Sequence, residues 1–82
     1  MSRIFAQTLS DKKVMSIDGV VIGTLENIIV DMKTGELIDL VVKPDIGLDT
    51  TDYRIEDDHV LLPFDSVRAI KDFISIDRKR VH

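Results

Sequence analysis

Short apolar runs separated by turn residues make up most of this chain. The run Val20–Met32 is rich in Ile and Val, and it lies between Asp18-Gly19 and Thr34-Gly35. Asp-Gly and Thr-Gly between apolar runs are hairpin signals, because Gly takes a positive φ without a Cβ clash. Ile, Val and Thr favour strands, since branched side chains pack well on a pleated surface. The pattern predicts a small antiparallel β protein.

The run Val20–Met32 is too long and too irregular for one flat strand. The apolar residues of this run that we expect to face the interior are Ile22, Leu25, Ile28 and Val30. Their intervals are three, three and two, whereas a regular strand alternates every second residue. A bulge near Gly23 or at Glu26-Asn27 would restore the inward phase, because Gly inside a strand often marks such a place. We expect a strongly bent strand, which a small closed barrel requires.

Five other runs have strand character. They are Lys13–Ile17, Leu37–Lys43, Val60–Phe64, Val67–Ile70 and Phe73–Asp77. Pro44 ends the second of these runs, and Pro63 implies an edge or a strand end, because Pro cannot donate to a ladder. Lys71-Asp72 is a plausible tight turn, and the longest irregular segment lies between Lys43 and His59. We predict an all-β fold, a small closed antiparallel β-barrel of about six strands.

The alternation also predicts which residues fill the interior. The expected core is Val14, Ile22, Leu25, Ile28, Val30, Ile38, Leu40, Val42, Val60, Leu62, Val67, Ile70, Ile74 and Ile76. With 82 residues, the chain is long enough for one domain, which we assign to residues 1–82 with a lead-in over 1–11 and a basic tail over 78–82. The six turn positions to which we assign a structural role are Asp18, Gly19, Gly23, Thr34, Gly35 and Pro63.

Composition narrows the classes of function. A net charge of −4 argues against nucleic-acid binding, which needs a basic surface to displace counterions. The absence of Cys removes disulfides, thiolate nucleophiles and zinc-thiolate sites together. No window approaches the ~18 apolar residues of a membrane span, so we expect no membrane insertion and a cytoplasmic location. The tail Arg78-Lys79-Arg80 is too small a charge cluster to anchor a protein on a membrane alone.

Four segments taken in order resemble the PRC-barrel family. They read KKVMSIDG, VIGTLENIIVD, TGELIDLVV and LLPFDSVRAI, and the resemblance covers roughly residues 9–77. The family is named for the cytoplasmic domain of the photosynthetic reaction-centre H subunit, and it includes the C-terminal domain of a bacterial ribosome-maturation factor. A chain that is only this barrel looks most like the stand-alone archaeal PRC-barrel proteins.

The resemblance implies a six-stranded barrel that acts as an adaptor for other proteins. Some of the archaeal proteins are implicated in cell division as partners of the division ring's membrane anchor, so that anchor is the partner that the resemblance implies. The resemblance carries over no catalytic residues and no cofactor. A ribosome- or RNA-maturation-associated binding module is the alternative, and a small-molecule hydrolase is the least supported class. An RNA contact should weaken steeply with salt, whereas a mainly apolar protein contact should not.

Candidate catalytic and metal sites are weak in this sequence. His59 and His82 are the only histidines, and no nucleophile, base and orienting acid form a recognisable set around them or around Asp65. We therefore expect no enzyme activity, no cofactor and no metal. Two distant histidines without Cys make a poor transition-metal site. We interpret His59 as a solvated loop residue.

The acidic segment 45–58 contains a stretch with the length of a calcium-binding loop. Asp45 to Glu56 spans the twelve residues of an EF-hand loop, with carboxylates at the first, fifth and twelfth positions. The third position is Gly47 and the sixth is Thr50, where the loop needs a ligand and a Gly respectively. We expect a solvated loop whose charge discourages edge pairing. Its apolar residues fold back onto the barrel more often than they face a partner.

Apolar residues in both phases of Val20–Met32 suggest more apolar surface than one interior can hide. Two-fold dimers are the commonest homo-oligomers, so we predict a homodimer, with a monomer that exposes a few aliphatic side chains as the alternative. The candidate interface residues are Val21, Ile29, Leu37 and Val41, with Leu48 and Tyr53 as a second choice.

Overall fold

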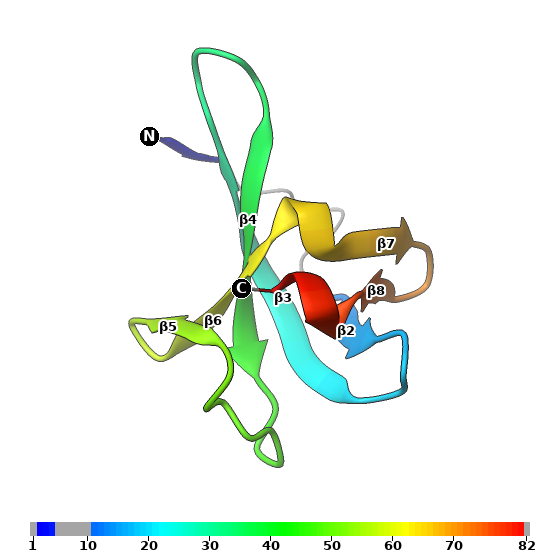
Figure 1. Cartoon of the computed structure of the whole chain (residues 1–82). Coiled ribbons are helices and arrows are strands. Elements are labelled where there is room, and N and C mark those ends of the chain that lie inside the picture. The colour runs from blue at the N-terminus through cyan, green and yellow to red at the C-terminus, as the bar shows by residue number, and fades with distance from the viewer. Residues whose placement is uncertain (1, 5–10, 82) are drawn as a thin grey trace.

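Eight β-strands form one sheet in the computed structural model, which describes residues 2–4 and 11–81 (Figure 1). The strands are β1 (Ser2–Ile4), β2 (Lys13–Ser16), β3 (Val21–Val30), β4 (Leu37–Pro44), β5 (Arg54–Glu56), β6 (His59–Pro63), β7 (Val67–Ile70) and β8 (Ile74–Ile76). Two 3-10 helices, η1 (Phe64–Ser66) and η2 (Arg78–Arg80), complete the elements, and no α-helix occurs within these ranges. The all-β prediction is confirmed.

The strand order is β5-β6-β4-β3-β2-β8-β7, with β1 on β3 as a branch. All neighbours are antiparallel except β2 and β8, where Val14 lies opposite Ile74 in a parallel ladder. The prediction of a closed antiparallel barrel of about six strands is therefore wrong in its details, because the sheet has eight strands and one of its ladders is parallel. Parallel pairing becomes possible here because a long connection, rather than a hairpin turn, joins β2 to β8. In the described residues no ladder joins the end strands β5 and β7.

Strand β3 has a register shift at each of the two places that its sequence offered as alternatives, and a third between Ile29 and Val30. Glu26 is skipped where Leu25 pairs with Val42 and Asn27 pairs with Val41, so the register with β4 shifts at this bulge. A second shift lies opposite Val14 and Met15 on β2, close to Gly23. The bend lets β3 serve both halves of the fold, with β4 and β6 on one side and β2, β8 and β7 on the other (Figure 1).

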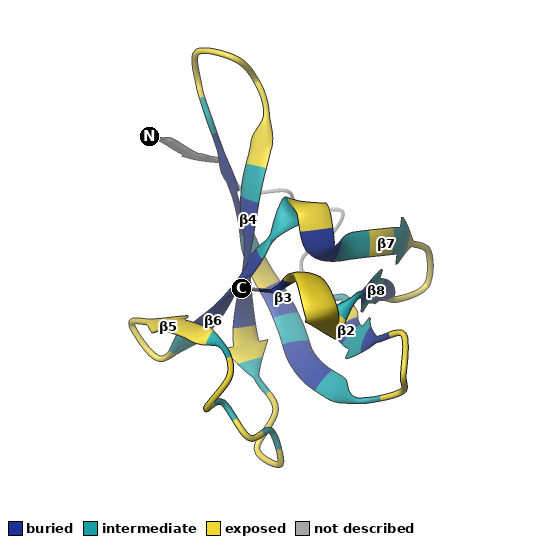
Figure 2. Cartoon of the chain, in the orientation of Figure 1, coloured by how far each residue is buried: buried dark blue, intermediate teal, exposed yellow. Residues whose placement is uncertain are grey.

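The main core lies between these two halves, where buried residues line the facing strands (Figure 2). It consists of Val14, Ile22, Leu25, Ile28, Val30, Leu40, Val42, Val60, Leu62, Ile74, Ile76 and Val81. The first eleven were predicted from the alternation. Ile70 is wrong, since it is 40% exposed on the end strand β7, where no further strand covers it. Val67 is half-buried against the core, and Ile38 is half-buried beside a second cluster.

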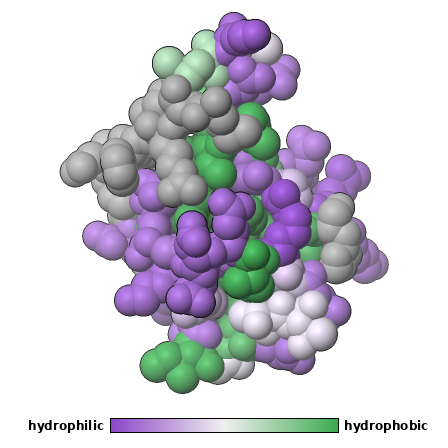
Figure 3. All heavy atoms as spheres, turned by 90° about the vertical axis from the view of Figure 1, so that its left-hand side faces the viewer, coloured by the Kyte–Doolittle hydropathy of each residue, from purple (hydrophilic) through white to green (hydrophobic). Residues whose placement is uncertain are grey.

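That second cluster is formed by Ile29, Val41 and Leu61, which alternate with the main-core residues along β3, β4 and β6. The three residues are only 8%, 4% and 8% exposed, so they are buried within one chain. On the side of the molecule that carries the β5–β6 hairpin, Figure 3 shows a mostly hydrophilic surface with hydrophobic side chains in smaller patches. The apolar residues on both faces of β3 are thus largely buried within one chain, in two separate clusters.

The segment expected to be irregular contains the β5–β6 hairpin. Asp57 and Asp58 form its turn with φ of 51° and 64°, a left-handed pair that the mirror-image hairpin turn requires. Asp tolerates this region better than most residues because its short polar side chain bonds locally. Arg54 on β5 forms an ion pair with Asp39 on β4, which ties the hairpin to the sheet. The hairpin was missed because an Asp-Asp turn lacks the usual Gly.

Candidate functional site

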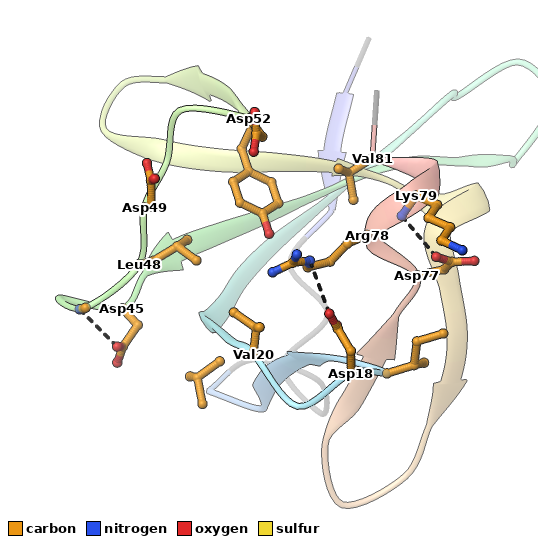
Figure 4. Close-up of a pocket in the computed structure, with 14 residues that line it drawn as sticks. Asp18, Val20, Asp45, Leu48, Asp49, Asp52, Asp77, Arg78, Lys79 and Val81 are labelled. Atoms are coloured by element: carbon orange, nitrogen blue, oxygen red, sulfur yellow. Dashed lines mark hydrogen bonds and ion pairs between the residues drawn. The ribbon is translucent and has the colours of Figure 1, made fainter.

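A groove lies between the β2–β3 turn, the β4–β5 loop and η2 (Figure 4). Its volume is about 930 Å³. Residues from three distant parts of the chain line it: Ile17 to Val21, Asp45 to Tyr53, and Asp77 to Val81. The tertiary fold therefore creates this site, because no single motif spans it.

The floor of the groove is apolar. Val20, Leu48 and Tyr53 are half-buried and pack against the main core, while Val81 is only 2% exposed. Ile17 lies at the margin and is 58% exposed. The side chains of Val20, Leu48 and Tyr53 rest on the core but remain accessible from the groove. Leu48 and Tyr53 thus fold back as expected, whereas Ile46 and Ile55 of the same acidic segment are exposed.

The wall contributed by the β4–β5 loop is acidic. Asp45 accepts a hydrogen bond from the Gly47 N–H at 3.1 Å, and Asp49 accepts from the Thr51 N–H at 3.0 Å and from its hydroxyl at 2.6 Å. The Thr51 hydroxyl is the main reason that the pKa of Asp49 lies below its usual value. These local bonds order the loop, and the bonds to Asp49 favour its carboxylate form.

The opposite wall carries an ion pair. Arg78 Nε of η2 lies 3.6 Å from Asp18 Oδ2 of the β2–β3 turn, and Figure 4 shows the two side chains pointing toward each other across one end of the groove. Hydrogen bonding to Ser16 is the main cause of the lowered pKa of Asp18, with Arg78 contributing less. Both side chains are half-exposed, so the pair orients Arg78 more than it stabilises the fold.

The C-terminal segment is part of the site rather than a free tail. Asp77 caps η2 by accepting a hydrogen bond from the Lys79 N–H at 3.0 Å, and Val81 then inserts into the core. Arg78, Lys79 and Arg80 are exposed, as expected for a basic segment. Sequence reasoning missed the segment's docking, although Asp77 as an N-cap and an apolar residue after three basic ones are signals for it.

Comparison with known proteins identifies this fold. The PRC-barrel domain matches residues 1–82. The chain belongs to the PRC-barrel family. An uncharacterized protein of the archaeon Methanocaldococcus jannaschii is 33% identical over 82 residues, which cover all of this chain and 90% of that protein. The resemblance first seen over residues 9–77 therefore extends along the whole PRC-barrel chain.

The predicted turns lie at the expected places in this PRC-barrel domain. Gly19 and Gly35 have φ of 91° and 76°, a conformation that Gly adopts without a Cβ clash. Thr34 accepts a hydrogen bond from the Glu36 N–H on its hydroxyl, at 3.2 Å. Pro63 ends β6 and precedes η1, and its carbonyl accepts the hydroxyl of buried Ser66 at 2.6 Å. These turns shape the barrel, and only the Asp18-Gly19 turn reaches the groove.

The six candidate interface residues separate into three groups. Val21, Leu48 and Tyr53 line the groove together. Ile29 and Val41 belong to the buried second cluster, so a partner cannot contact them without rearranging the chain. Leu37 is 39% exposed at the start of β4, away from the groove. Their role in an interface stays a prediction.

His59 is not the free loop residue that we expected. Its Nε2 lies 2.5 Å from Glu26 Oε2 at the bulge of β3, and its Nδ1 lies 2.8 Å from the Asp57 carbonyl oxygen. These contacts, with the Asp57 carbonyl first, raise the pKa of His59 above 6.5. Asp65 is exposed on η1 and outside the groove, and His82 lies outside the described residues.

Tyr53 is the one hydroxyl-bearing aromatic residue of the groove. Burial against the core raises the pKa of its hydroxyl, while nearby Arg78 opposes that shift. Over residues 2–4 and 11–81, no group of three or more His, Asp or Glu side chains is arranged to hold a metal ion. Within the same residues no helix is long and apolar enough to cross a membrane. The groove thus offers apolar contact and charge as its means of recognition.

Proposed function

We propose that this PRC-barrel domain is a non-enzymatic adaptor that binds other proteins in the cytoplasm, as part of the archaeal cell-division machinery. The observation that carries the proposal is the groove, whose apolar floor is surrounded by charged residues. Protein interfaces have this composition, with an apolar centre and a polar rim that stays hydrated. The expected partner is the membrane anchor of the division ring.

The chemistry of the groove favours binding over catalysis. A general acid near neutral pH needs a carboxyl group with a raised pKa. Asp18 and Asp49 instead have lowered pKa values, so each remains a carboxylate at neutral pH. The histidine that could serve as a base, His59, bonds to Glu26 outside the groove. The ionised aspartates serve recognition in this proposal.

The archaeal part of the proposal is supported by the relative from Methanocaldococcus jannaschii. The link to cell division comes from the resemblance to stand-alone archaeal PRC-barrel proteins. As part of the same proposal, two copies associate as a homodimer through exposed residues such as Leu37, leaving the groove open. Leu37 is the candidate interface residue that is exposed and lies away from the groove.

The test is a comparison in the native cell of the wild-type protein and a groove variant, Leu48→Asp. Leu48 is half-buried at the surface, so the substitution places a charge on the floor while the main core stays intact. Each protein is tagged, cross-linked in living cells, and its partners are identified by mass spectrometry. We expect a division protein to be enriched with the wild type and lost with Leu48→Asp.

Three results would contradict all or part of this proposal. Co-sedimentation with ribosomal subunits that disappears steeply with added salt would support the RNA-maturation alternative instead. Substrate turnover that depends on a single polar residue, such as Asp65 or His59, would show that the domain is an enzyme. Normal division in cells that lack the protein would remove the link to cell division but leave the adaptor role.

A further inference from the structure

We propose that the occupant of the groove is a protein segment that combines Lys or Arg side chains with aliphatic ones. This inference rests on the proposed adaptor function and names the chemistry of its partner. The groove has two features that must be matched at the same time. It has an apolar floor, and it has an acidic wall that no basic residue of the described chain neutralises.

The charges of the groove do not balance. The lining contains five aspartates, Asp18, Asp45, Asp49, Asp52 and Asp77, against two basic residues, Arg78 and Lys79. Arg78 is already paired with Asp18. The described residues form no ion pair with the loop aspartates Asp45, Asp49 and Asp52. The loop wall is therefore negative, whereas the opposite wall is compensated by the chain itself.

The chain itself shows that a cation fits in this groove. The guanidinium of Arg78 points from η2 toward Asp18, within the space between the two walls (Figure 4). This pair joins two segments that are distant in sequence. A basic side chain of a partner could pair with an aspartate of the loop wall in the same way. A partner cation near Asp49 would meet a carboxylate that Thr51 holds in place, with Asp52 in the same wall.

The floor requires that the occupant also be apolar. Val20, Val21 and Leu48 line the groove together with the ring of Tyr53. A hydrophilic cation alone would leave this surface in water, whereas an aliphatic side chain would remove apolar area from water. A segment with both kinds of side chain gains from the floor and from the wall. An acidic segment would face repulsion from the same wall.

The test is an NMR titration of the isotope-labelled full chain with a short peptide that alternates Lys and Leu. Two matched peptides replace every Lys or every Leu by Ser. We expect the alternating peptide to shift the amide signals of Val20, Leu48 and Tyr53, and each Ser peptide to bind at least about tenfold more weakly, because each lacks one of the two contributions.

Two pairs of substitutions separate groove recognition from general attraction to an acidic protein. Asp49→Asn with Asp52→Asn removes two charges from the groove wall, and Asp57→Asn with Asp58→Asn removes two from the β5–β6 turn. Asn accepts the same loop hydrogen bonds and tolerates the left-handed backbone at the turn. We expect the groove pair to weaken peptide binding about tenfold, and the turn pair to change it less than about twofold.

Three results would overturn part or all of this inference. Equal weakening by both pairs would overturn the inference, because it would show attraction to the net charge alone. Equal binding of the peptide without Lys would overturn the cationic requirement while leaving an adaptor groove. Signal shifts confined to residues outside the groove would overturn the site itself, and with it the observation on which the proposed function depends.

Discussion

Gly23 on β3 and Lys43 on β4 approach so closely that a side chain at Gly23 cannot be accommodated. A Cβ built on Gly23 would lie 1.9 Å from the carbonyl oxygen of Lys43 and 2.9 Å from its carbonyl carbon. Both contacts are with backbone, which cannot move aside as the end of a side chain can. Gly23 lies opposite Pro44 in the β3–β4 ladder, so the end of β4, and with it the loop that begins at Asp45, lies beside the bend of β3. The Asp45 N–H then donates to the Ile22 carbonyl at 2.9 Å.

We predict that Gly23→Ala destabilises the fold by about 1–3 kcal/mol, the usual cost of forcing extra atoms into a packed site. The measurement is the midpoint of urea unfolding. Gly47→Ala is the control, since its Cβ would meet only the end of the Asp45 side chain, at 3.4 Å, and should change the midpoint little. Equal midpoints for Gly23→Ala and the wild type would show that the backbones of β3 and β4 do not approach so closely at Gly23 in solution.

Leu40 tests the main core. It is 1% exposed on β4, so Leu40→Ala should cost about 2–5 kcal/mol through lost burial and the cavity left behind. Leu37→Ala on the same strand is the matched control, because Leu37 is 39% exposed and loses little on truncation. Urea unfolding of the two variants measures the difference. Similar losses of stability at the two positions would contradict the assignment of inward and outward faces along β4.

His59 should make stability depend on pH. Its pKa is raised above 6.5 in the folded chain, so the folded state binds the proton more tightly than the unfolded state does. The resulting stabilisation is fully present below pH 6.5 and is lost as the pH rises through the raised value. We predict that His59→Gln reduces the unfolding midpoint more at about pH 5.5 than at about pH 8.5.

The control for this prediction is His82→Gln, which leaves the contact between His59 and Glu26 in place. Its pH dependence of unfolding should match that of the wild type. A wild-type profile that does not differ from that of His59→Gln between the two pH values would show that the pair contributes no stability in solution.

Self-association can be tested at Leu37 and Ile29. If the proposed dimer forms, light scattering on a sizing column should give a mass near twice the 9.3 kDa of one chain, and Leu37→Lys should reduce it to one chain. Ile29→Lys should unfold the protein instead, because Ile29 is 8% exposed in the second cluster and a lone buried cation is costly. A single-chain mass for the wild type at every concentration would rule out the dimer.

Local sequence predicted six of the eight strands and the bends of this protein. The alternation of apolar and polar residues predicted eleven of the twelve main-core residues. The uneven spacing along β3 predicted a bulge near Gly23 or at Glu26-Asn27, and the register shifts at both places. Both kinds of signal are local, because side chains alternate along a strand and a bulge changes the phase within a few residues. The Asp18-Gly19 and Thr34-Gly35 turns could also be predicted from the sequence, because a turn depends on adjacent residues.

Tertiary structure decided everything that joins distant segments. Alternation marked Ile70 as inward-facing, but the end position of β7 leaves it exposed, since no further strand covers it. The sequence predicted that Ile29 and Val41 face outward, but the structure buries them with Leu61 of β6 in the second cluster. The groove depends on Asp18, Leu48 and Arg78, three segments that no spacing in the sequence connects. Their meeting follows from the β3 bend and from Val81, whose burial draws the C-terminal segment against the barrel.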